Sequence, residues 1–192
     1  MKIVIVALVC LSLVKSVSAQ QDLLSFDEHN KYIYYQVVDK SGVSADSLKI
    51  RAIAFLKFSF PKNKVKQNDA PDQISGTGKF LVLTGLTLVK HEDGAIAYNF
   101  NIECKDQKYR YWLTNFVFTP YQRDRYGNFV PHPGIEIPLE AANEKLDKRD
   151  ALNYLGQTGT FCKLFGDKLR LFMVNGPKKN SEVIKKIVTD KW

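Results

Sequence analysis

The chain has 192 residues, of which 28 are lysine or arginine, 20 are aspartate or glutamate, three are histidine and three are cysteine. This length suits one domain whose core is large enough to be stable without a metal or several disulfides. The histidines, His29, His91 and His132, are scattered singly and no Cys-x-x-Cys pair is present, so the sequence excludes a structural zinc site. We expect neither a bound metal nor a cofactor.

The first nineteen residues have the pattern of a secretory signal peptide. Lys2 supplies the positive charge, Ile3–Val14 form an apolar run, and small residues ending at Ala19 offer a cleavage site before Gln20. About a dozen apolar residues are too few for the roughly 20 that span a bilayer. We therefore expect a periplasmic or secreted protein that does not span the membrane, with a mature net charge of about +6.

Residues 20–31 form a polar lead-in, and the first regular elements follow it. Tyr32–Val38 are β-branched and aromatic, which predicts a strand closed by a turn over residues 39–42. Ser44 is a good helix N-cap and Asp46 a good first-turn acid, ahead of apolar residues spaced by three and four. This pattern predicts a helix from Ala45 to Phe60, followed by a loop over residues 62–71.

Three strands are predicted next, over residues 73–88, 94–104 and 108–119. In the second, Ile96, Tyr98, Phe100, Ile102 and Cys104 alternate with Ala97, Asn99, Asn101 and Glu103. Such alternation is typical of an antiparallel strand with one buried face and one wet face. Composition predicts turns at residues 91–94 and 105–108, so the three strands should form a meander.

The C-terminal third returns to a helical pattern after a long irregular segment. Residues 120–138 contain four prolines and no sustained periodicity, which predicts a long loop. A helical stripe follows, made of Leu152, Leu155, Gly159, Cys162, Gly166, Leu169 and Met173. Gly156 and Gly159 favour a kink or a break, Gly176 ends the helix, and the basic tail 177–192 has room for a short helix at 182–188.

The order β-α-β-β-β-α predicts an α+β fold in which a curved antiparallel sheet packs against two helices. Residues 108–116 (KYRYWLTNF) follow a Tyr98-x-Phe100-x-Ile102 strand, and Ile74-x-Gly76-x-Gly78 follows an amphipathic helix. In these features the chain resembles a domain family of unknown function, with a TBP-like fold, from exported proteins of Bacteroides-group bacteria. The resemblance implies a TBP-like domain over residues 32–176 and supplies no catalytic residues.

The wet face of the sheet is the candidate binding surface. We expect Tyr109 and Tyr111 to lie on it beside Asn99, Asn101 and Asn115, with the opposite face of that strand in the core and formed by Trp112, Phe116 and Phe118. Exposed tyrosines can bind a protein, a peptide or a glycan, or they can simply pair across strands and stabilise the sheet. The face lacks the lysine and arginine density of a nucleic-acid site.

Catalytic patterns are weak throughout the chain. There is no Gly-x-Ser-x-Gly sequence, and the acid pairs Glu92 with Asp93 and Glu136 with Glu140 fit a turn and a helix start better than glycoside hydrolysis. Gly76 and Gly78 are too few for a phosphate loop and indicate a bulge or bend. We expect a non-enzymatic envelope domain. The alternative is a small secreted hydrolase with a site under residues 120–138, using Arg123, Asp124 or His132.

Cys104 and Cys162 are both predicted to face the core. An exported chain permits a disulfide between them, and the alternative is two buried, unpaired thiols. Spacing alone does not choose between these states.

Overall fold

The computed structural model describes residues 23–66, 72–84 and 91–176. Its strands are β1 Ser25–Phe26, β2 Tyr32–Asp39, β3 Lys64–Lys66, β4 Gln73–Thr84, β5 His91–Lys105, β6 Lys108–Arg123, β7 Phe129–Pro131 and β8 Ile137–Pro138. Its helices are α2 Ala45–Ser59, the 3-10 helix η3 Leu139–Ala141, α3 Ala142–Lys145 and α4 Lys148–Asn175. The predicted signal peptide 1–19, the tail 177–192 and its helix at 182–188 lie outside the described residues.

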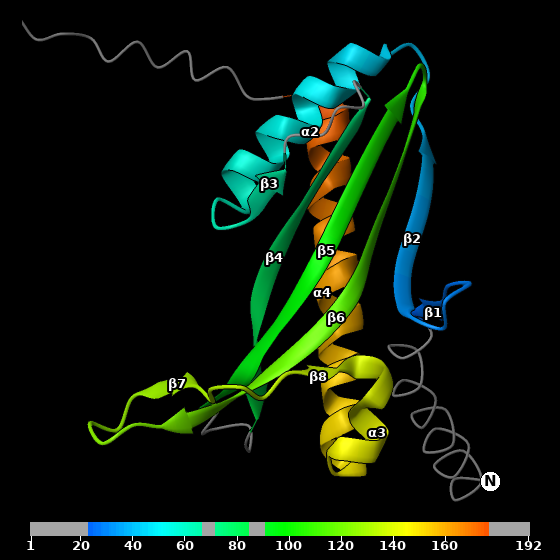
Figure 1. Cartoon of the computed structure of the whole chain (residues 1–192). Helices are drawn as coiled ribbons and strands as arrows, with labels where there is room; N and C mark the ends of the chain where they lie inside the picture. The colour runs from blue at the N-terminus through cyan, green and yellow to red at the C-terminus, as the bar shows by residue number, and fades with distance from the viewer. Residues whose placement is uncertain (1–22, 67–71, 85–90, 177–192) are drawn as a thin grey trace, which may run out of the picture.

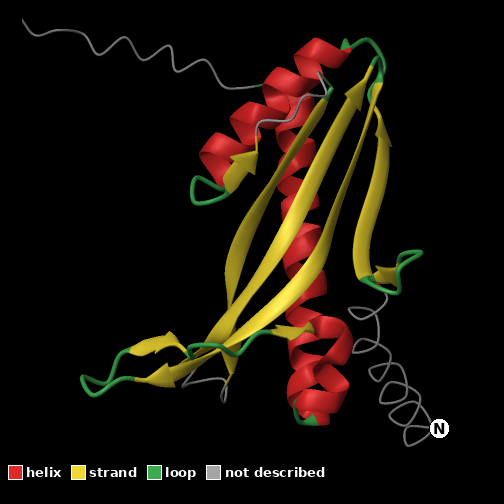
Figure 2. Cartoon of the chain, in the orientation of Figure 1, coloured by secondary structure: helices red, strands yellow, loops and turns green. Residues whose placement is uncertain are grey.

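The strands form an open antiparallel sheet in the order β1-β2-β6-β5-β4-β3, with β7 and β8 paired to β6. Helices α2 and α4 lie on one side of the long curved strands, and Figures 1 and 2 show that no helix of the described ranges lies on the other side. The predicted α+β class, a curved antiparallel sheet packed against helices, is therefore confirmed. None of the helices in the described ranges is long and apolar enough to cross a bilayer.

Helix α2 forms as its sequence predicts. The Ser44 side chain accepts a hydrogen bond from the backbone N–H of Ser47, which satisfies one of the unpaired donors of the first turn. Four apolar residues at helical spacing, Leu48, Ala52, Phe55 and Leu56, are buried against the sheet and α4. The helix ends one residue earlier than predicted, at Ser59.

Helix α4 runs without a break for 28 residues, about 42 Å at the rise of an α-helix. The glycines predicted to interrupt it do not: Gly159 is buried, and Gly156 is partly buried where it lines a groove between α4 and β4. The predicted stripe is buried from Leu155 to Met173, but Leu152 is 39% exposed and was wrongly placed in it. Gly176 ends the helix at φ 68°, as predicted.

Aromatic rings hold the two helices to the sheet. Phe165 of α4 meets Phe55 of α2 edge to face, with centroids 5.0 Å apart, and Phe161 stacks on Phe80 of β4 at 4.1 Å. Such pairs are worth about 0.5–1.5 kcal/mol beyond the apolar area that they bury. The core is therefore a continuous layer between the sheet and both helices.

Two predicted irregular segments contain strands instead. Within the predicted loop 62–71, residues Lys64–Lys66 form β3 on the edge of β4. The predicted turn at residues 91–94 is the start of β5, where Gly94 is buried and its missing side chain leaves room for the Phe118 ring. Gly76 and Gly78 are likewise required by close packing rather than by a bulge, since an added Cβ would lie 2.6 Å from ring atoms of Phe100 and Tyr98.

The predicted loop at residues 120–138 is largely a β-hairpin. Strand β6 continues to Arg123, turns, and pairs with β7, while β8 returns to pair with Val117 and Phe118. Asp124 accepts backbone hydrogen bonds from Tyr126 and Asn128, which fixes the turn. Figure 1 shows this hairpin extending away from the helices.

Candidate functional site

A bulge in β6 decides which side chains the sheet exposes. Ala97 pairs with Val117 and Asn99 pairs with Thr114, so both Asn115 and Phe116 lie opposite the single residue Tyr98. Asn115 takes φ 54°, a left-handed conformation that asparagine tolerates better than most residues. The extra residue reverses the alternation of side chains beyond this point.

Because of this reversal, the predicted assignment of Tyr109 and Tyr111 to the wet face is wrong. Both are 2% exposed and pack beneath α4, where Tyr111 lies 6.3 Å from the Phe165 ring. Burial raises the pKa of both tyrosines. The hypothesis that these two tyrosines bind a partner at the surface therefore loses its basis. Trp112 was also wrongly predicted to lie in the core; it is partly exposed and points away from the helices.

The uncovered face carries a different aromatic pair, Tyr35 of β2 and Trp112 of β6. They are direct cross-strand partners, and their ring centroids are 6.3 Å apart. Tyr35 is 45% exposed, and Trp112 is partly exposed. The row continues across the sheet: Asn101 of β5 lies opposite Trp112, and Ser75 of β4 lies opposite Asn101.

Arg110 joins this pair from the neighbouring row of the same face. Its guanidinium carbon lies 5.5 Å from the Trp112 ring centroid, within the range of a cation–π contact. Its Nε and Nη2 both lie 2.6 Å from the same Glu103 oxygen. Hydrogen bonding raises the pKa of Arg110, with Tyr35 making the larger contribution and Glu103 the next. Tyr35, Trp112, Arg110 and Glu103 thus form one group of contacting side chains, which we call the Tyr35–Trp112 cluster.

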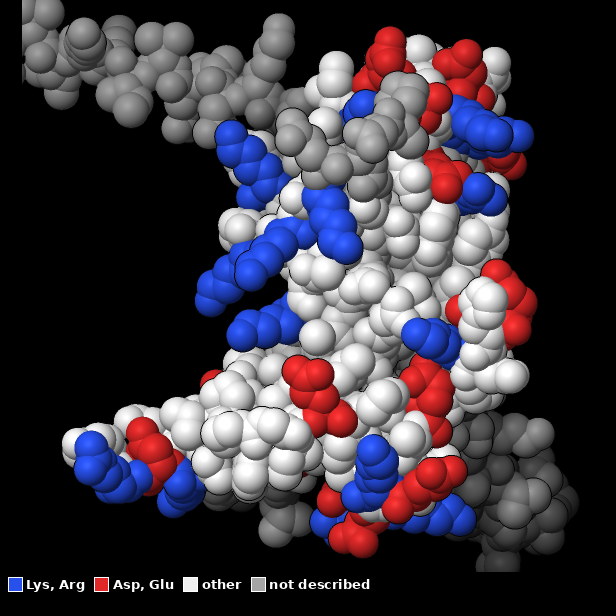
Figure 3. All heavy atoms as spheres, viewed as in Figure 1, with Lys and Arg blue, Asp and Glu red and all other residues white. Residues whose placement is uncertain are grey.

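The predicted asparagines lie around this cluster and are partly exposed. Asn101 accepts a hydrogen bond from Gln73, Asn115 accepts one of 2.6 Å from Lys31, and Asn99 lies opposite Thr114. Depressions of about 230 and 780 Å³ flank the cluster, and Tyr35 and Arg110 line both. Figure 3 shows that charged side chains gather mainly around this face and leave much of its centre uncharged.

Sequence reasoning missed Tyr35, Arg110 and Trp112 as a group. The exposure of one tyrosine in β2 could have been predicted. Tyr34 and Tyr35 are consecutive in a strand and point to opposite faces, so one of the two must lie outside the core. The position of Trp112 could have been found only by recognising Asn115 as a bulge residue.

The residues of the alternative hydrolase site are each engaged in a local contact of the β6–β7 hairpin. The Arg123 guanidinium lies over the Phe129 ring at 4.9 Å, Asp124 holds the hairpin turn, and His132 Nδ1 faces the carbonyl oxygen of its neighbour Pro133. One member of each acid pair is also engaged in a hydrogen bond with a residue distant in the sequence. Asp93 accepts a hydrogen bond from the Tyr154 hydroxyl, and Glu140 accepts one from the backbone N–H of Tyr32.

Cys104 and Cys162 are both buried and unpaired, so the second of the two predicted states is observed. Burial raises the pKa of the Cys104 thiol to about 11 and also raises that of Cys162. Both thiols are therefore protonated near neutral pH and unsuited to nucleophilic catalysis. Across the described ranges, no group of three or more histidine, cysteine, aspartate or glutamate side chains is placed to hold a metal.

An open antiparallel sheet with helices α2 and α4 on one face makes this an α+β domain. Comparison with protein families agrees with this: residues 34–119 match the model of a "domain of unknown function (DUF4468) with TBP-like fold", so the predicted TBP-like fold is confirmed. The resemblance inferred from the sequence is confirmed. No curated protein matches the chain.

Two solved structures share the fold. A TBP-like protein from Parabacteroides distasonis matches with a TM-score of 0.61 and 17% identity, over 79% of this chain and 97% of its own. A DUF4468 family protein from Bacteroides ovatus matches with a TM-score of 0.59 and 12% identity, over 82% of this chain and 94% of its own. At these identities the similarity concerns the fold alone.

Proposed function

We propose that this protein is an exported, non-enzymatic binding domain that recognises a protein partner through the uncovered face of its sheet. The Tyr35–Trp112 cluster carries this proposal. Tryptophan, tyrosine and arginine are the residues that most often dominate the energy of protein interfaces. Here they adjoin one another on a face whose centre is largely uncharged (Figure 3).

The cluster is also organised in advance of binding. Arg110 is held by Glu103 and by its contact with Trp112, so little side-chain entropy is lost when a partner covers it. Arg110 also covers part of the Trp112 ring, which favours a protein over a stacked sugar. Partly exposed asparagines supply the polar surroundings typical of an interface rim.

Two further observations support the export and the non-enzymatic role. The pattern of residues 1–19 is that of a cleavable signal. The candidate catalytic side chains Arg123, Asp124 and His132 are engaged in local contacts of the β6–β7 hairpin. Expression with the native N-terminus, followed by fractionation and N-terminal sequencing, tests the export. We expect the exported form to begin at Gln20.

Binding is tested with the domain lacking residues 1–19, used as bait in an envelope extract of the expressing cells. Quantitative mass spectrometry then compares the wild type with Trp112→Ala and with the control Leu171→Ala. Leu171 is a matched control, because it is 62% exposed and lies on α4 rather than on the sheet. We expect a protein retained by the wild type and the control but lost from Trp112→Ala.

The purified partner then allows titration calorimetry with Tyr35→Ala and Trp112→Ala. Each change should weaken binding at least tenfold, the size expected for a residue that dominates an interface. Equal capture by Trp112→Ala and the control would refute the proposed face. Retention on immobilised envelope polysaccharide, lost with Trp112→Ala in the absence of any protein partner, would assign a glycan instead.

A further inference from the structure

The outer edge of β4 is left without a neighbouring strand over much of its length. β3 pairs only with Ser75, Gly76 and Thr77, and in the described part of the chain no strand continues that pairing along Gly78–Thr84. An open strand edge presents backbone N–H and C=O groups that can pair with another chain. Proteins usually protect such edges, so the way in which this one is protected is informative.

A side chain of α4 occupies the hydrogen-bonding position at Leu83. The Leu83 N–H donates to Gln157 Oε1 at 3.0 Å, and Gln157 Nε2 donates to the Leu83 carbonyl oxygen at 2.8 Å. An adjacent antiparallel strand would make the same two bonds through its own backbone N–H and C=O. Gln157 also donates to Asn153 Oδ1 at 3.2 Å, which holds its amide in place. The amide therefore stands where the backbone of a further strand would lie.

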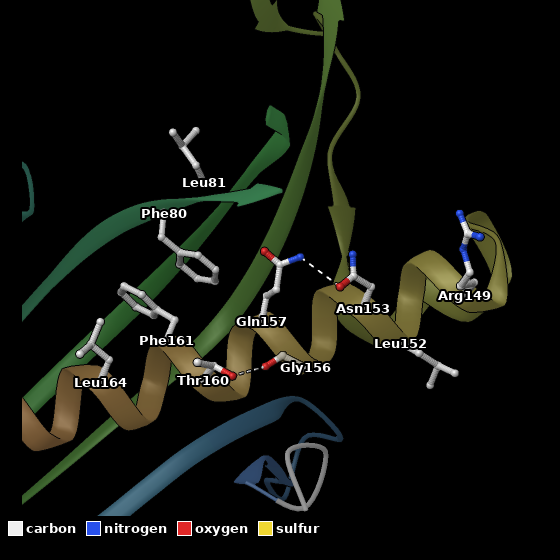
Figure 4. A pocket seen from close by; sticks show the side chains of 10 residues that line it. All are labelled: Phe80, Leu81, Arg149, Leu152, Asn153, Gly156, Gln157, Thr160, Phe161 and Leu164. Atoms are coloured by element: carbon white, nitrogen blue, oxygen red, sulfur yellow. Dashed lines mark hydrogen bonds between the residues drawn. The ribbon is translucent and has the colours of Figure 1, made fainter. Parts of the chain in front are cut away.

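A groove of about 620 Å³ runs between this part of β4 and α4. Figure 4 shows Phe80 and Phe161 facing each other between the strand and the helix, with Gln157 and Asn153 further along α4. Leu81 and Leu164 also line the groove, and each is 47% exposed. A strand presents alternate side chains to one face, so an added strand could place every second apolar side chain against Phe161 and Leu164, on the side that Phe80 faces. Leu81 follows Phe80 in β4 and faces the opposite side of the sheet.

The charges near this edge are strongly biased. Residues 57–66 and 72–84 contain five lysines and one aspartate. The lysines are all exposed, and they are Lys57, Lys62, Lys64, Lys66 and Lys79. Figure 3 shows basic side chains gathered along the side of the molecule formed by α2, β3 and β4. A second copy of this chain would bring like charges together here, whereas an acidic strand would be attracted.

We propose that the outer edge of β4 binds an extended peptide segment of alternating acidic and apolar residues, which adds to the sheet as a strand. The segment displaces the Gln157 amide from Leu83, places its apolar side chains in the groove, and directs its carboxylates to the lysines. This is a second surface, independent of the Tyr35–Trp112 cluster. It follows the general mode in which main-chain bonds give affinity and alternate pockets give specificity.

The test uses the domain lacking residues 1–19 and a fluorescein-labelled octapeptide of alternating glutamate and valine. We expect saturable binding by fluorescence anisotropy and, by nuclear magnetic resonance, slowed amide exchange at Leu83 in the complex. Gln157→Ala should strengthen binding several-fold, because no internal group then competes for Leu83. Leu164→Asp should weaken it about tenfold through lost apolar contact and added repulsion.

The contribution of the lysines is measured separately. Lys79→Glu should weaken binding of the glutamate peptide severalfold and reduce its dependence on salt. A lysine–valine octapeptide of the same length should bind at least tenfold more weakly than the glutamate peptide. Trp112→Ala should bind the peptide as the wild type does, which separates this site from the proposed protein-binding face.

Folding of each variant is verified by circular dichroism and thermal melting before binding is measured. No saturable binding by the wild type would overturn the proposal. So would equal binding of the acidic and basic peptides, or binding that neither Gln157→Ala nor Leu164→Asp changes.

Discussion

Gly166→Ala should destabilise the domain although alanine is the better helix former. A Cβ added at Gly166 would overlap the Tyr111 hydroxyl oxygen and would lie 3.1 Å from Tyr111 Cζ. Tyr111 is 2% exposed and sits between α4 and the sheet, so its ring has little room to move. Overpacking of this kind costs about 1–3 kcal/mol, whereas the glycine-to-alanine gain in helix propensity is at most about 1 kcal/mol.

We therefore expect a net loss of about 1–2 kcal/mol, measured as the free energy of unfolding in urea by circular dichroism. The melting temperature should fall by about 2–8 °C for a domain of this size. Gly156→Ala is the matched control in the same helix, because a Cβ there has no neighbour within 4 Å. It should stabilise the domain by about 0.5–1 kcal/mol.

A third variant identifies the contact that is responsible. In a Tyr111→Phe background the overlapping oxygen is absent, so Gly166→Ala should cost much less than in the wild type, in a double-mutant cycle. If Gly166→Ala and Gly156→Ala change the unfolding free energy equally, the close packing of Tyr111 under α4 is refuted.

Three further predictions follow from the bulge, the thiols and the hairpin. Asn115→Val should lower the unfolding free energy by about 1–2 kcal/mol more than Asn115→Gly, because a β-branched residue is strained at φ 54°; equal losses would contradict the left-handed backbone. Cys104 and Cys162 should resist thiol reagents in the folded domain, and denaturation without reductant should release two titratable thiols, whereas none would reveal a disulfide. Hydrogen bonds from Asn128 are the main cause of the lowered pKa of Asp124, which lies below the usual 3.8. The stability that these bonds give the turn is therefore present above pH 3.8 and is lost as the pH falls through the lowered pKa. An Asn128 amide resonance that does not shift as the pH is lowered from 5 through this range would be inconsistent with the bond.

The elements with strong local periodicity could be predicted from the sequence. Helix α2 was anticipated because Ser44 and the three- and four-residue spacing of Leu48, Ala52 and Phe55 specify both its start and its buried side. Strand β5 was anticipated over most of its length because its core residues alternate without interruption. In both cases the signal lies within a few residues of the element itself.

The exposed face could not be predicted, because it depends on one residue that breaks a regular pattern. Alternation through β6 assigns Tyr111 and Phe116 to opposite faces, and only the bulge at Asn115 brings both into the core. A single asparagine within an aromatic strand gives little warning of a left-handed conformation.

The segments at residues 64–66 and 129–138 were missed for another reason. Strands of two or three residues, such as β3, β7 and β8, are too short to show a period and exist because a longer strand is available to pair with them. The bond between Gln157 and Leu83 joins residues 74 positions apart. Its existence depends on the packing of α4 beside β4, which no local pattern encodes.

The bulge also sets different tolerances for changes of length along one strand. Up to Thr114, β6 pairs with β2 and supports the aromatic face, and beyond Phe116 it pairs with β8 and β7. Inserting or deleting one residue between these two parts would turn one of them over, moving its apolar side chains from the helices to solvent. The number of residues in β6 is thus as constrained as their identity. The tip of the hairpin around Gly127 lies beyond both paired parts, where the chain can lengthen or shorten without disturbing either face.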